Sequence, residues 1–478
     1  MGQDIILTAS EALERIAAAL ENIPADLRMT LSLPGLPLPP FFPASERQAS
    51  AAEIALSDRL SSFCARVSRR PDLFVVNPFR LAVESPPAGR FDLQSDLVLG
   101  FPYTVSHASA LAASHALLMA PRQPRKGIIT DLDDTLWDGV AGEVGPDAVS
   151  WDLSRHHHLH ALYQNLLLSL SEQGVLVGVA SKNDPAIVER CFARADILLR
   201  AEKVFPFEVH WGAKSRSVAR ILQTWNIAAD SVIFVDDSPM ELAEVAAAHP
   251  GMECLRFPKG DYAAGLDLLW RIRDLCGKPA ISPDDVLRLA SLRQGAEFRR
   301  LSQDAVTPDE FLRQAQAAIS CHFGPGAGDA RALELVNKTN QFNLNGARRT
   351  EADWRCLLQQ PDGVLAVLGY EDRFGPLGKI SVIQGQRRDN VLHVNTWVMS
   401  CRAFSRRIEY QCLHVLFERL GVETMLFDFT PTAKNRPLQE FFETLLGFMP
   451  EGPLTLSRRE FAARCPALFH AVSEHWES

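Results

Sequence analysis

Three short apolar runs that each end in polar or acidic residues constrain the fold more than any other feature of the sequence. The runs are GIITDLDD (127–134), VLVGVASKND (175–184) and SVIFVDDSP (231–239), and stretches with helical spacing of apolar residues separate them. Apolar strands that alternate with amphipathic helices predict a parallel sheet covered by helices on both faces. Ligands of such sheets bind beyond the carboxyl ends of the strands. We therefore expect the polar residues at these ends to form a functional site.

Five aspartates stand at two of these strand ends, where like charges repel one another. Asp131, Asp133 and Asp134 follow the first apolar run, and Asp236 and Asp237 follow the third. Carboxylates that converge on one point raise each other's pKa values unless a cation neutralises them. Mg²⁺ takes oxygen ligands in octahedral geometry and keeps waters and a substrate phosphate in its shell. The sequence therefore predicts a magnesium site at this edge of the sheet.

Two further residues suit the binding of phosphate oxygens. Ser181 follows the second apolar run and supplies a hydroxyl donor, and Lys214, in HWGAKSRS, supplies a fixed positive charge. This ordered set of residues resembles the four motifs of the haloacid dehalogenase (HAD) superfamily of phosphotransferases. A single D-x-D-x-T stretch can be an ordinary surface loop. Here, however, four motifs occur in order, each at a predicted strand end or in the loop that follows it.

The HAD resemblance implies a role for each motif residue. Asp131 would be the nucleophile that forms an aspartyl-phosphate, and Asp133 would act as general acid and then as general base. The residues that hold the transferring phosphate would be Thr135, Ser181 and Lys214. The ligands of Mg²⁺ would be Asp131, the carbonyl of Asp133, Asp237 and, as neighbour or co-ligand, Asp236. No large insertion separates the motifs, so we expect an open site that admits a sizeable or protein-borne substrate.

The last third of the chain has a different pattern. Residues 363–385 and 391–402 alternate like antiparallel strands before the helical stretch SRRIEYQCLHVLFERLG. The run TPTAKNRPLQEFFETLLGF (430–448) resembles the end of the N-acetyltransferase-type (GNAT) fold, through Asn435, the helix after it and Leu446-Gly447-Phe448. In that fold, pantetheine lies between two splayed strands. Where the fold has a glycine-containing pyrophosphate loop, this chain has Ser405 and Arg407, and arginines suit the single phosphate of a phosphopantetheine arm or an acidic carrier protein.

The combination of both regions is more specific than either one. A HAD-like region followed by NKTNQFNLNGARR (337–349), SCRAFSRRIE (400–409) and PTAKN (431–435) resembles the FkbH-like family over residues 126 to about 450. That resemblance implies an enzyme that loads three-carbon glyceryl units from 1,3-bisphosphoglycerate onto acyl carrier proteins in polyketide and related pathways. It implies dephosphorylation in the HAD domain and acyl transfer through a thiol in the GNAT-like domain. The implied partners are a phosphorylated three-carbon donor and a phosphopantetheinylated acyl carrier protein, and the implied cofactor is Mg²⁺.

Cys401 is the thiol that this resemblance selects. It stands at a predicted strand end beside Arg402, and nearby cations favour a reactive thiolate, although an isolated Cys is more often a small buried hydrophobe. The run NKTNQFN has more amides than a helix favours, which indicates either a ligand-binding loop or a turn that satisfies its own backbone. The residues expected to hold the acyl group or pantetheine are Lys338, Asn340, Gln341, Asn343, Arg402, Arg406, Arg407 and Asn435.

The fold class expected from these patterns is α/β, with a Rossmann-like HAD domain followed by a GNAT-like α+β domain that has a mixed or antiparallel sheet. A proline-rich break (31–45) interrupts the first segment, which has helical stretches at 9–27 and 51–69. Ser457 and Glu460 form a capping-box pattern that predicts a terminal helix over 457–476. The predicted segments are an N-terminal αβ segment of unknown role (1–122), the HAD-like domain (123–275), a helical connection (276–320), the GNAT-like domain (321–450) and a C-terminal helix (451–478).

Composition limits the partners and the compartment. The formal net charge of -9 argues against nucleic-acid or anionic-membrane binding, because either would need a basic surface. No apolar run reaches the roughly 18 residues that a membrane-spanning helix needs, and the first residues lack the pattern of a signal peptide. The nine cysteines include no C-x-x-C pair, so we expect reduced thiols and a cytoplasmic protein.

Three hypotheses follow from the sequence. The first is a Mg²⁺-dependent HAD phosphatase coupled to acyl transfer through Cys401. The second is a HAD phosphatase whose GNAT-like domain only docks a carrier protein or another partner, an alternative that the altered glycine loop keeps open. The third is a binding protein in which both sites have decayed, and the intact set of four HAD motifs speaks against it.

Overall fold

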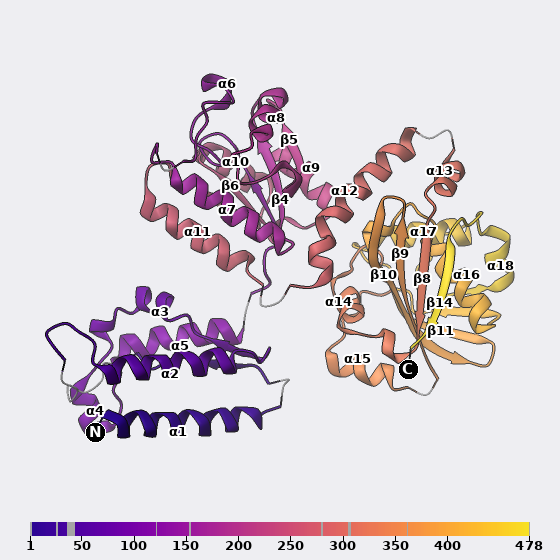
Figure 1. The fold of residues 1–478 in the computed structure, drawn as a ribbon. Coiled ribbons are helices and arrows are strands. Elements are labelled where there is room, and N and C mark those ends of the chain that lie inside the picture. The colour runs from indigo at the N-terminus through magenta and orange to yellow at the C-terminus, as the bar shows by residue number, and fades with distance from the viewer. Residues whose placement is uncertain are drawn as a thin grey trace. The chain divides into compact units, whose positions relative to one another are not determined.

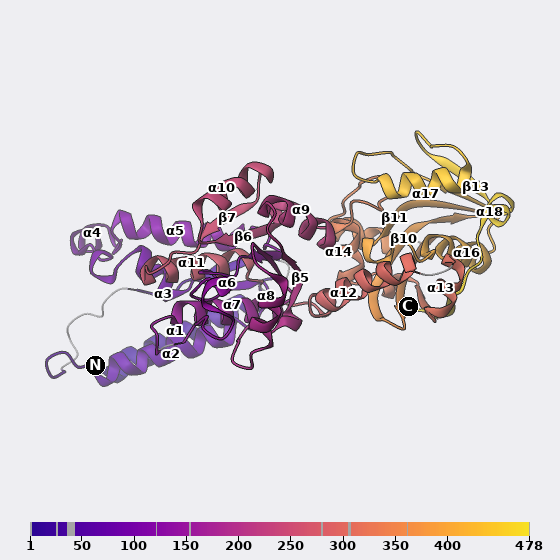
Figure 2. The same ribbon diagram turned by 90° about the horizontal axis from the view of Figure 1, so that it is seen from above.

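The computed structural model describes residues 2–24, 27–35, 44–120, 122–152, 154–278, 281–304, 307–360 and 362–477 (Figures 1 and 2). Contacts between residues divide the chain into two compact units, Met1–Gln123 and Pro124–Ser478. Much of the predicted proline-rich break lies outside the described residues. Across the described ranges, no helix combines the length and the apolar character that crossing a bilayer requires.

The N-terminal unit is a small αβ body. Its two strands, β1 (Met29–Leu31) and β2 (Leu73–Val75), pair in parallel. Its helices are α1 (Gly2–Glu21), α2 (Ala51–Val67), α3 (Pro78–Glu84), α4 (Leu93–Leu99) and α5 (Val105–Met119), with a 3₁₀ turn η1 (Pro87–Gly89). Helix α2 begins with a capping box formed by Ser50 and Glu53, and apolar side chains of α1, α2 and β2 make the core. The helix predicted at 9–27 corresponds to α1, which begins and ends closer to the N-terminus than predicted.

The second unit begins with a five-stranded sheet in which every pairing is parallel. The strand order is β5-β4-β3-β6-β7. The strands are β3 (Gly127–Thr130), β4 (Leu176–Ser181), β5 (Val204–Val209), β6 (Val232–Asp236) and β7 (Glu253–Arg256). The chain runs outward from β3 to β5 and then returns to β6, so the winding direction changes at β3. This is the topological switch point at which open α/β sheets bind ligands.

Helices cover both faces of this sheet, as the apolar runs predict. Apolar residues of α7, α8 and α11 form one core with the sheet, and those of α9 and α10 form a second core. The helices are α6 (Ala141–Val144), α7 (His158–Glu172), α8 (Pro185–Ala193), α9 (Lys214–Trp225), α10 (Pro239–Ala248) and α11 (Tyr262–Cys276), with 3₁₀ turns η2 (Ala201–Lys203) and η3 (Ala229–Ser231). Strands β3, β4 and β6 are buried at every position, which explains why their sequences read as continuous apolar runs.

Two helices connect this region to the next sheet. They are α12 (Pro283–Asp304) and α13 (Pro308–Gln314). Near the start of α12, the Arg288 guanidinium donates a hydrogen bond to the Gly174 carbonyl at 2.7 Å and pairs with Asp285 at 2.6 Å. The helix also contacts β10 and the turn η5 of the following sheet. Helix α12 therefore joins both parts of the second unit.

The second sheet has seven strands in the order β13-β12-β11-β10-β9-β8-β14, with mixed directions. Its strands are β8 (Ala318–Phe323), β9 (Gly363–Asp372), β10 (Gly375–Arg388), β11 (Val391–Met399), β12 (Thr424–Phe427), β13 (Leu454–Ser457) and β14 (Ala471–Trp476). Strands β8 to β11 are antiparallel neighbours, and β11 and β12 are parallel. A parallel α/β sheet followed by a mixed sheet confirms the predicted fold class.

Helices lie on both faces of the mixed sheet. Helices α14 and α15 share one core with it, and α16 and α17 share the other. The elements are α14 (Ala330–Lys338), α15 (Glu351–Leu358), α16 (Ile408–Leu420), α17 (Arg436–Leu446) and α18 (Arg458–Arg464), with 3₁₀ turns η4 (Pro325–Ala327) and η5 (Cys401–Ala403). The predicted boundary at 321 falls inside β8, because the sheet begins at Ala318.

The predicted terminal helix is wrong in its second half. The capping box of Ser457 and Glu460 does start α18, but that helix ends at Arg464, and residues 471–476 form strand β14. Pro466 lies two residues after the end of this helix, and a proline disfavours helical geometry at the residue before it, here Cys465, which is extended. The backbone of β8 then offers parallel pairing, in which the Ala471 amide donates to the Ala317 carbonyl at 2.9 Å. The mixed sheet therefore extends to residue 476, beyond the predicted limit of 450.

Candidate functional site

Three carboxylates converge beyond the carboxyl ends of β3 and β6. Asp131 follows β3, and its amide donates to the Val235 carbonyl on the neighbouring β6 at 2.9 Å. Asp236 is the last residue of β6, and Asp237 follows it. One carboxylate oxygen from each of the three lies within 4.8 Å of the others. The parallel sheet therefore brings together residues that are about a hundred positions apart in the sequence, as the strand-end argument predicted.

Lys214 is the cation that faces this cluster. It is the first residue of α9, and only 4% of the residue is exposed. Its Nζ atom lies 3.0 Å from Asp131 Oδ1 and 2.5 Å from Asp236 Oδ2. Burial alone would lower the pKa of Lys214, but the charges of Asp131 and Asp236 outweigh burial and raise it. Lys214 therefore carries a fixed positive charge beside Asp131.

The negative charge of the three carboxylates exceeds the positive charge of Lys214. Burial, followed by the charge of Asp131, raises the pKa of Asp236 from 3.8 to about 7, and the same two causes raise the pKa of Asp237. Three carboxylates facing one lysine leave an excess of two negative charges when all are ionised. Hard oxygen donors with this excess fit a divalent cation such as Mg²⁺. Asp131, Asp236 and Asp237 are the residues that would hold it.

Asp133 has a different environment from the three clustered carboxylates. Its Oδ1 atom accepts hydrogen bonds from Trp137 Nε1 at 2.9 Å and from the Ala141 amide at 3.1 Å, and its Oδ2 atom accepts from Asn183 Nδ2 at 2.9 Å. Burial raises the pKa of Asp133, although these hydrogen bonds oppose the rise. A positioned carboxyl group with a raised pKa suits a proton donor. Its side chain is outside the cluster that would hold the metal.

Asn183 and Trp137 were not selected from the sequence. Asn183 is 1% exposed and lies in the loop after β4, two residues beyond Ser181. The strand-end argument could have included Asn183, because it also follows a buried strand. Nothing in the spacing of the sequence indicated that the Trp137 indole would bind Asp133.

The two predicted phosphate-binding hydroxyls have different surroundings. Thr135 is fully buried, and its Oγ1 atom accepts a hydrogen bond from the Asp237 amide at 3.1 Å. Thr135 thus ties the loop after β3 to the loop after β6. Ser181 is the last residue of β4 and is 3% exposed, and its hydroxyl has no hydrogen-bond partner among the described residues. Of the two, Ser181 has the hydroxyl that remains available to a ligand.

A second group of predicted residues lines a cavity of about 720 Å³. Cys401 begins the turn η5 directly after β11 and Ser400, and it is half-buried. The predicted residues that share the wall with it are Lys338, Asn340, Gln341 and Arg402. The structure therefore brings half of the expected acyl-binding residues to one cavity beside the thiol.

The other expected acyl-binding residues have internal partners. Asn343 donates to the Thr339 carbonyl and accepts from the Asn345 and Gly346 amides. Asn435 donates to the carbonyls of Asn343 and Thr430 at 3.0 and 2.9 Å. Of the two alternatives considered for the run NKTNQFN, a ligand-binding loop or a turn that satisfies its own backbone, the hydrogen bonds of Asn343 are those of the turn.

Arg406 and Arg407, which follow Arg402 in the same loop, are not part of the cavity wall. Arg406 is 3% exposed, pairs with the buried Asp372 at 3.4 Å and stacks over the Phe298 ring at 3.8 Å. Arg407 pairs with Asp309 and donates to the Ala467 carbonyl. The structure thus assigns Arg406 and Arg407 to internal contacts rather than to a phosphate.

The loop keeps the backbone geometry of the glycines that it lacks. Ser405 and Arg407 have φ angles of 66° and 58°, in the left-handed region that glycine normally occupies. The side chains at these positions nevertheless leave less room for a close approach of phosphate to the backbone.

The space between the splayed strands β11 and β12, where the GNAT resemblance places pantetheine, is filled by a segment of the chain itself. Strands β11 and β12 pair only over Val391–Val394 and Thr424–Phe427. Beyond that point, Phe342–Leu344 enters between them. The Leu344 amide donates to the Trp397 carbonyl at 2.9 Å, and the Thr430 amide donates to the Leu344 carbonyl at 3.0 Å. Phe342 and Leu344 are 1% and 0% exposed, so this segment is part of the core.

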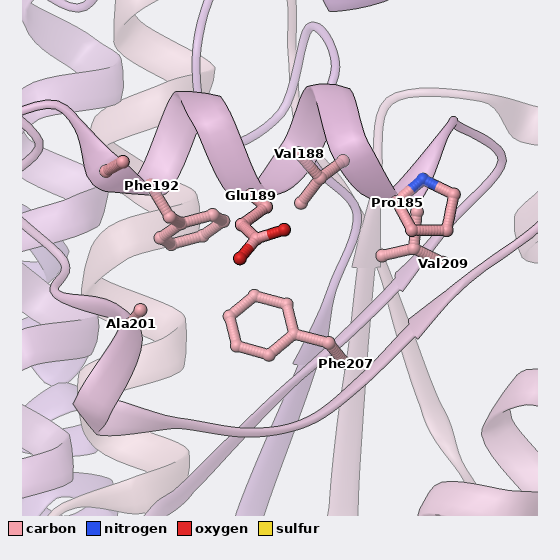
Figure 3. Close-up of a pocket in the computed structure, with 8 residues that line it drawn as sticks. Pro185, Val188, Glu189, Phe192, Ala201, Phe207 and Val209 are labelled. Carbon is pink, nitrogen blue, oxygen red and sulfur yellow. The ribbon is translucent and has the colours of Figure 1, made fainter.

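Another pocket, of about 470 Å³, lies between α8 and β5 (Figure 3). Its walls are apolar, with Val188 and Phe192 from α8 facing Phe207 from β5. Glu189 is the one charged side chain among the described residues that line it. An apolar pocket with a single negative charge does not suit a phosphate, and none of the predicted site residues lines it.

Comparisons with known proteins give no family assignment. No protein-family model matches the chain, and no curated protein matches it. Among solved structures, the chain is similar to the N-terminal part of protein BF1531 from Bacteroides fragilis, which contains a phosphatase domain and was solved in complex with Mg. That similarity covers 59% of this chain and 75% of the other, with 20% identity and a TM-score of 0.47.

Two further solved structures are less similar. An uncharacterised protein from Corynebacterium glutamicum matches 32% of this chain over 98% of its own length, with 18% identity and a TM-score of 0.23. Malonyl-CoA decarboxylase from Rhodopseudomonas palustris matches 56% of this chain over 65% of its own length, with 12% identity and a TM-score of 0.20. The functional assignment therefore rests on the geometry of the site.

Proposed function

We propose that the protein is a Mg²⁺-dependent phosphatase of the HAD type, with Asp131 as its nucleophile. The observation that carries this proposal is the convergence of Asp131, Asp236 and Asp237 within 4.8 Å, with Lys214 3.0 Å from Asp131. Mg²⁺, when bound, supplies positive charge to the phosphate oxygens and reduces the repulsion between them and the carboxylates.

The residues of the chain account for both halves of the reaction. An Asp131 oxygen attacks phosphorus while the bond between phosphorus and the leaving oxygen breaks, and Asp133 protonates that oxygen. Asp133, now ionised, takes a proton from the water that hydrolyses the aspartyl-phosphate, which restores Asp131 and releases inorganic phosphate. Lys214 and the Ser181 hydroxyl bind the oxygens of the transferring phosphoryl group.

Phosphate release from a phosphomonoester such as p-nitrophenyl phosphate tests this assignment. Wild-type protein with Mg²⁺ should release phosphate, and Asp131→Asn should lower the rate at least a thousandfold, because the nucleophile is lost. Asp267→Asn is the matched control, since Asp267 is exposed on α11 and outside the site. Release that persists in Asp131→Asn would reject Asp131 as the nucleophile.

We further propose that the mixed-sheet domain transfers an acyl group through Cys401. The donor would be a phosphorylated three-carbon acyl phosphate resembling 1,3-bisphosphoglycerate. The Cys401 thiolate would attack the acyl carbon, and the bond from that carbon to the phosphate oxygen would break, so that phosphate leaves with the electron pair. The phosphopantetheine thiol of an acyl carrier protein would then take the glyceryl group from Cys401, as in polyketide or related biosynthesis. The position of Cys401 on the wall of a large cavity supports this proposal.

Intact-mass measurement after incubation with 1,3-bisphosphoglycerate tests the acyl-enzyme. A glyceryl adduct that is absent in Cys401→Ala and retained in Cys356→Ala would support it. Cys356 is the appropriate control because it is an exposed thiol on α15. An adduct that persists in Cys401→Ala would exclude Cys401 as the acceptor.

The second candidate function is a phosphatase whose mixed-sheet domain only docks a carrier protein or another partner. The observation that favours it is the filling of the cleft between β11 and β12 by Phe342–Leu344, where an acyl carrier's arm would otherwise lie. Phosphate release without any adduct on Cys401 would support this candidate over acyl transfer.

A further inference from the structure

The cavity beside Cys401 lies at the edge of the parallel sheet opposite to the three carboxylates. Lys126 immediately precedes β3, and Leu176 is the first residue of β4, so both line the cavity from the amino-terminal edge. Asp131 follows the other end of β3. Five residues of extended chain separate Lys126 from Asp131, which corresponds to about 16 Å. The cavity and the carboxylate cluster are therefore two distinct sites.

The charge of the cavity is strongly positive although the whole chain has a net charge of -9. Among the described residues, Glu334 is the single carboxylate on its wall. The basic residues on the wall are Lys126, Arg288, Arg331, Lys338, Arg402 and Lys434. Glu334 pairs with Arg331 and Lys338, and Arg288 pairs with Asp285. Lys126 and Lys434 have no ion-pair partner among the described residues, so their positive charges remain uncompensated in the cavity.

Lys126 is the clearest case of a basic residue without a paired carboxylate. It is half-buried, and its Nζ atom forms no hydrogen bond or ion pair with any residue in the described part of the chain. Burial lowers the pKa of Lys126, and the nearby charges of Lys338 and Arg288 lower it further, whereas the charges of Asp230 and Glu334 oppose them. A half-buried cation without an ion-pair partner is unfavourable unless an anion binds it. The arrangement therefore indicates a negatively charged ligand.

The wall around Lys126 is built from both parts of the second unit. The Trp225 ring fits against Gly127 and Gly178, where an added Cβ would come within 2.6 and 2.8 Å of it. Beside Trp225, the Asn226 and Gln341 amides exchange two hydrogen bonds, at 3.1 and 2.8 Å. The hydrogen bonds between Asn226 and Gln341 join the parallel-sheet wall of the cavity to the Cys401 wall.

We infer that this cavity is a second phosphate-binding site, which holds a ligand with its phosphate near Lys126 and Arg288 and its other end near Cys401. The inference rests on the proposed function only for the role of the thiol. It supplies a route to Cys401 that replaces the filled cleft between β11 and β12. It also means that the thiol and Asp131 act at separate places, so a ligand with two phosphates must move between them.

Two ligands share the required chemistry, a phosphate joined to a short chain that reaches the thiol. One is the free phosphorylated acyl donor, and the other is the phosphopantetheine arm of a carrier protein. Protection of Cys401 from alkylation by iodoacetamide tests the site with defined probes, which are 3-phosphoglycerate for the donor and 4′-phosphopantetheine for the arm. Peptide mass spectrometry reads Cys401, and the exposed Cys356 serves as an internal reference.

The measurement uses the full chain with Asp131→Asn, so that hydrolysis of the probe does not affect the result. We expect at least one probe to protect Cys401. Lys126→Gln should require about tenfold more probe, as expected for the loss of one charge-assisted hydrogen bond. Lys434→Gln should also weaken protection, and it provides a variant at an exposed position that does not threaten folding. Lys203→Gln is the matched control outside the cavity wall.

Each outcome decides the inference. Protection by 3-phosphoglycerate alone assigns the site to the donor, protection by 4′-phosphopantetheine alone assigns it to the carrier arm, and protection by both assigns it to a shared phosphate subsite. Protection by neither probe would overturn the inference, and so would equal protection in the Asp131→Asn protein with and without the Lys126→Gln and Lys434→Gln substitutions. If the wild-type protein releases no phosphate from p-nitrophenyl phosphate while the Asp131→Asn protein shows Lys126-dependent protection, the proposed phosphatase would be rejected and this site retained.

Discussion

Asp236→Asn tests whether the carboxylate cluster is built for a cation. Asp236 is fully buried at the end of β6, and its Oδ2 atom lies 2.5 Å from Lys214 Nζ. Because its pKa is raised in the folded protein, the folded state is favoured when Asp236 is protonated. That contribution is fully present below the unfolded pKa near 3.8 and is lost as the pH rises through about 7. Metal-free wild-type protein should therefore lose stability over this pH range.

The size of the effect follows from the pKa values. The difference between 3.8 and about 7 is about 3 pKa units, and each unit corresponds to about 1.4 kcal/mol, which gives up to about 4 kcal/mol at pH 8. Asn cannot ionise, and its amide oxygen can still accept a hydrogen bond from Lys214. Without metal, Asp236→Asn should therefore be more stable than wild type at pH 8 by as much as this amount, and the difference should be small at pH 4.

Urea denaturation at pH 4, 6 and 8 in EDTA measures this difference. Added Mg²⁺ should reverse the order at pH 8, because wild type keeps all its ligands and the variant has lost one. Asp267→Asn, at an exposed position of α11, is the control for the loss of a negative charge. If Asp236→Asn is less stable than wild type at pH 8 without metal, the reasoning about repulsion in this cluster is refuted.

Two further substitutions test the surroundings of the two sites. Asn183→Ala removes the 2.9 Å hydrogen bond to Asp133 Oδ2, so kcat for phosphomonoester hydrolysis should fall about tenfold to a hundredfold with little change in KM; an unchanged kcat would remove Asn183 from the site. Arg406→Met leaves Asp372, whose side chain is 2% exposed, without its cation and should cost about 3 kcal/mol of unfolding free energy; an unchanged midpoint in urea would contradict the internal role of Arg406.

The carboxylate site could be predicted because the ends of buried strands can be recognised from short stretches of the sequence. The apolar runs identify the buried strands, parallel pairing aligns their carboxyl ends, and the aspartates at those ends must then meet. Asp131, Asp236 and Asp237 follow this rule. The partners of Asp133 could not be predicted in the same way, because they depend on how the loop around Trp137 turns back on itself.

The acyl-binding residues were harder to predict because a resemblance identifies positions and not hydrogen-bond partners. Amide side chains satisfy backbone groups as readily as they bind ligands, and this is the observed role of Asn343 and Asn435. The insertion of Phe342–Leu344 between β11 and the chain after β12 is a long-range pairing, and no local sequence pattern predicts it. The wrong prediction of a helix over 471–476 has the same cause. Strand β14 forms there because it pairs with the edge of β8, which its own sequence does not indicate.

A crystal structure with Mg²⁺ and beryllium fluoride, a mimic of a phosphoryl group, shows directly whether Asp131 is the nucleophile of a magnesium site. We expect beryllium fluoride bonded to a carboxylate oxygen of Asp131 and Mg²⁺ at about 2.1 Å from oxygens of Asp131 and Asp237. Lys214 should contact the fluorides from the first turn of α9. Beryllium fluoride bonded to another residue, or Mg²⁺ bound away from Asp131 and Asp237, would exclude this assignment of the site.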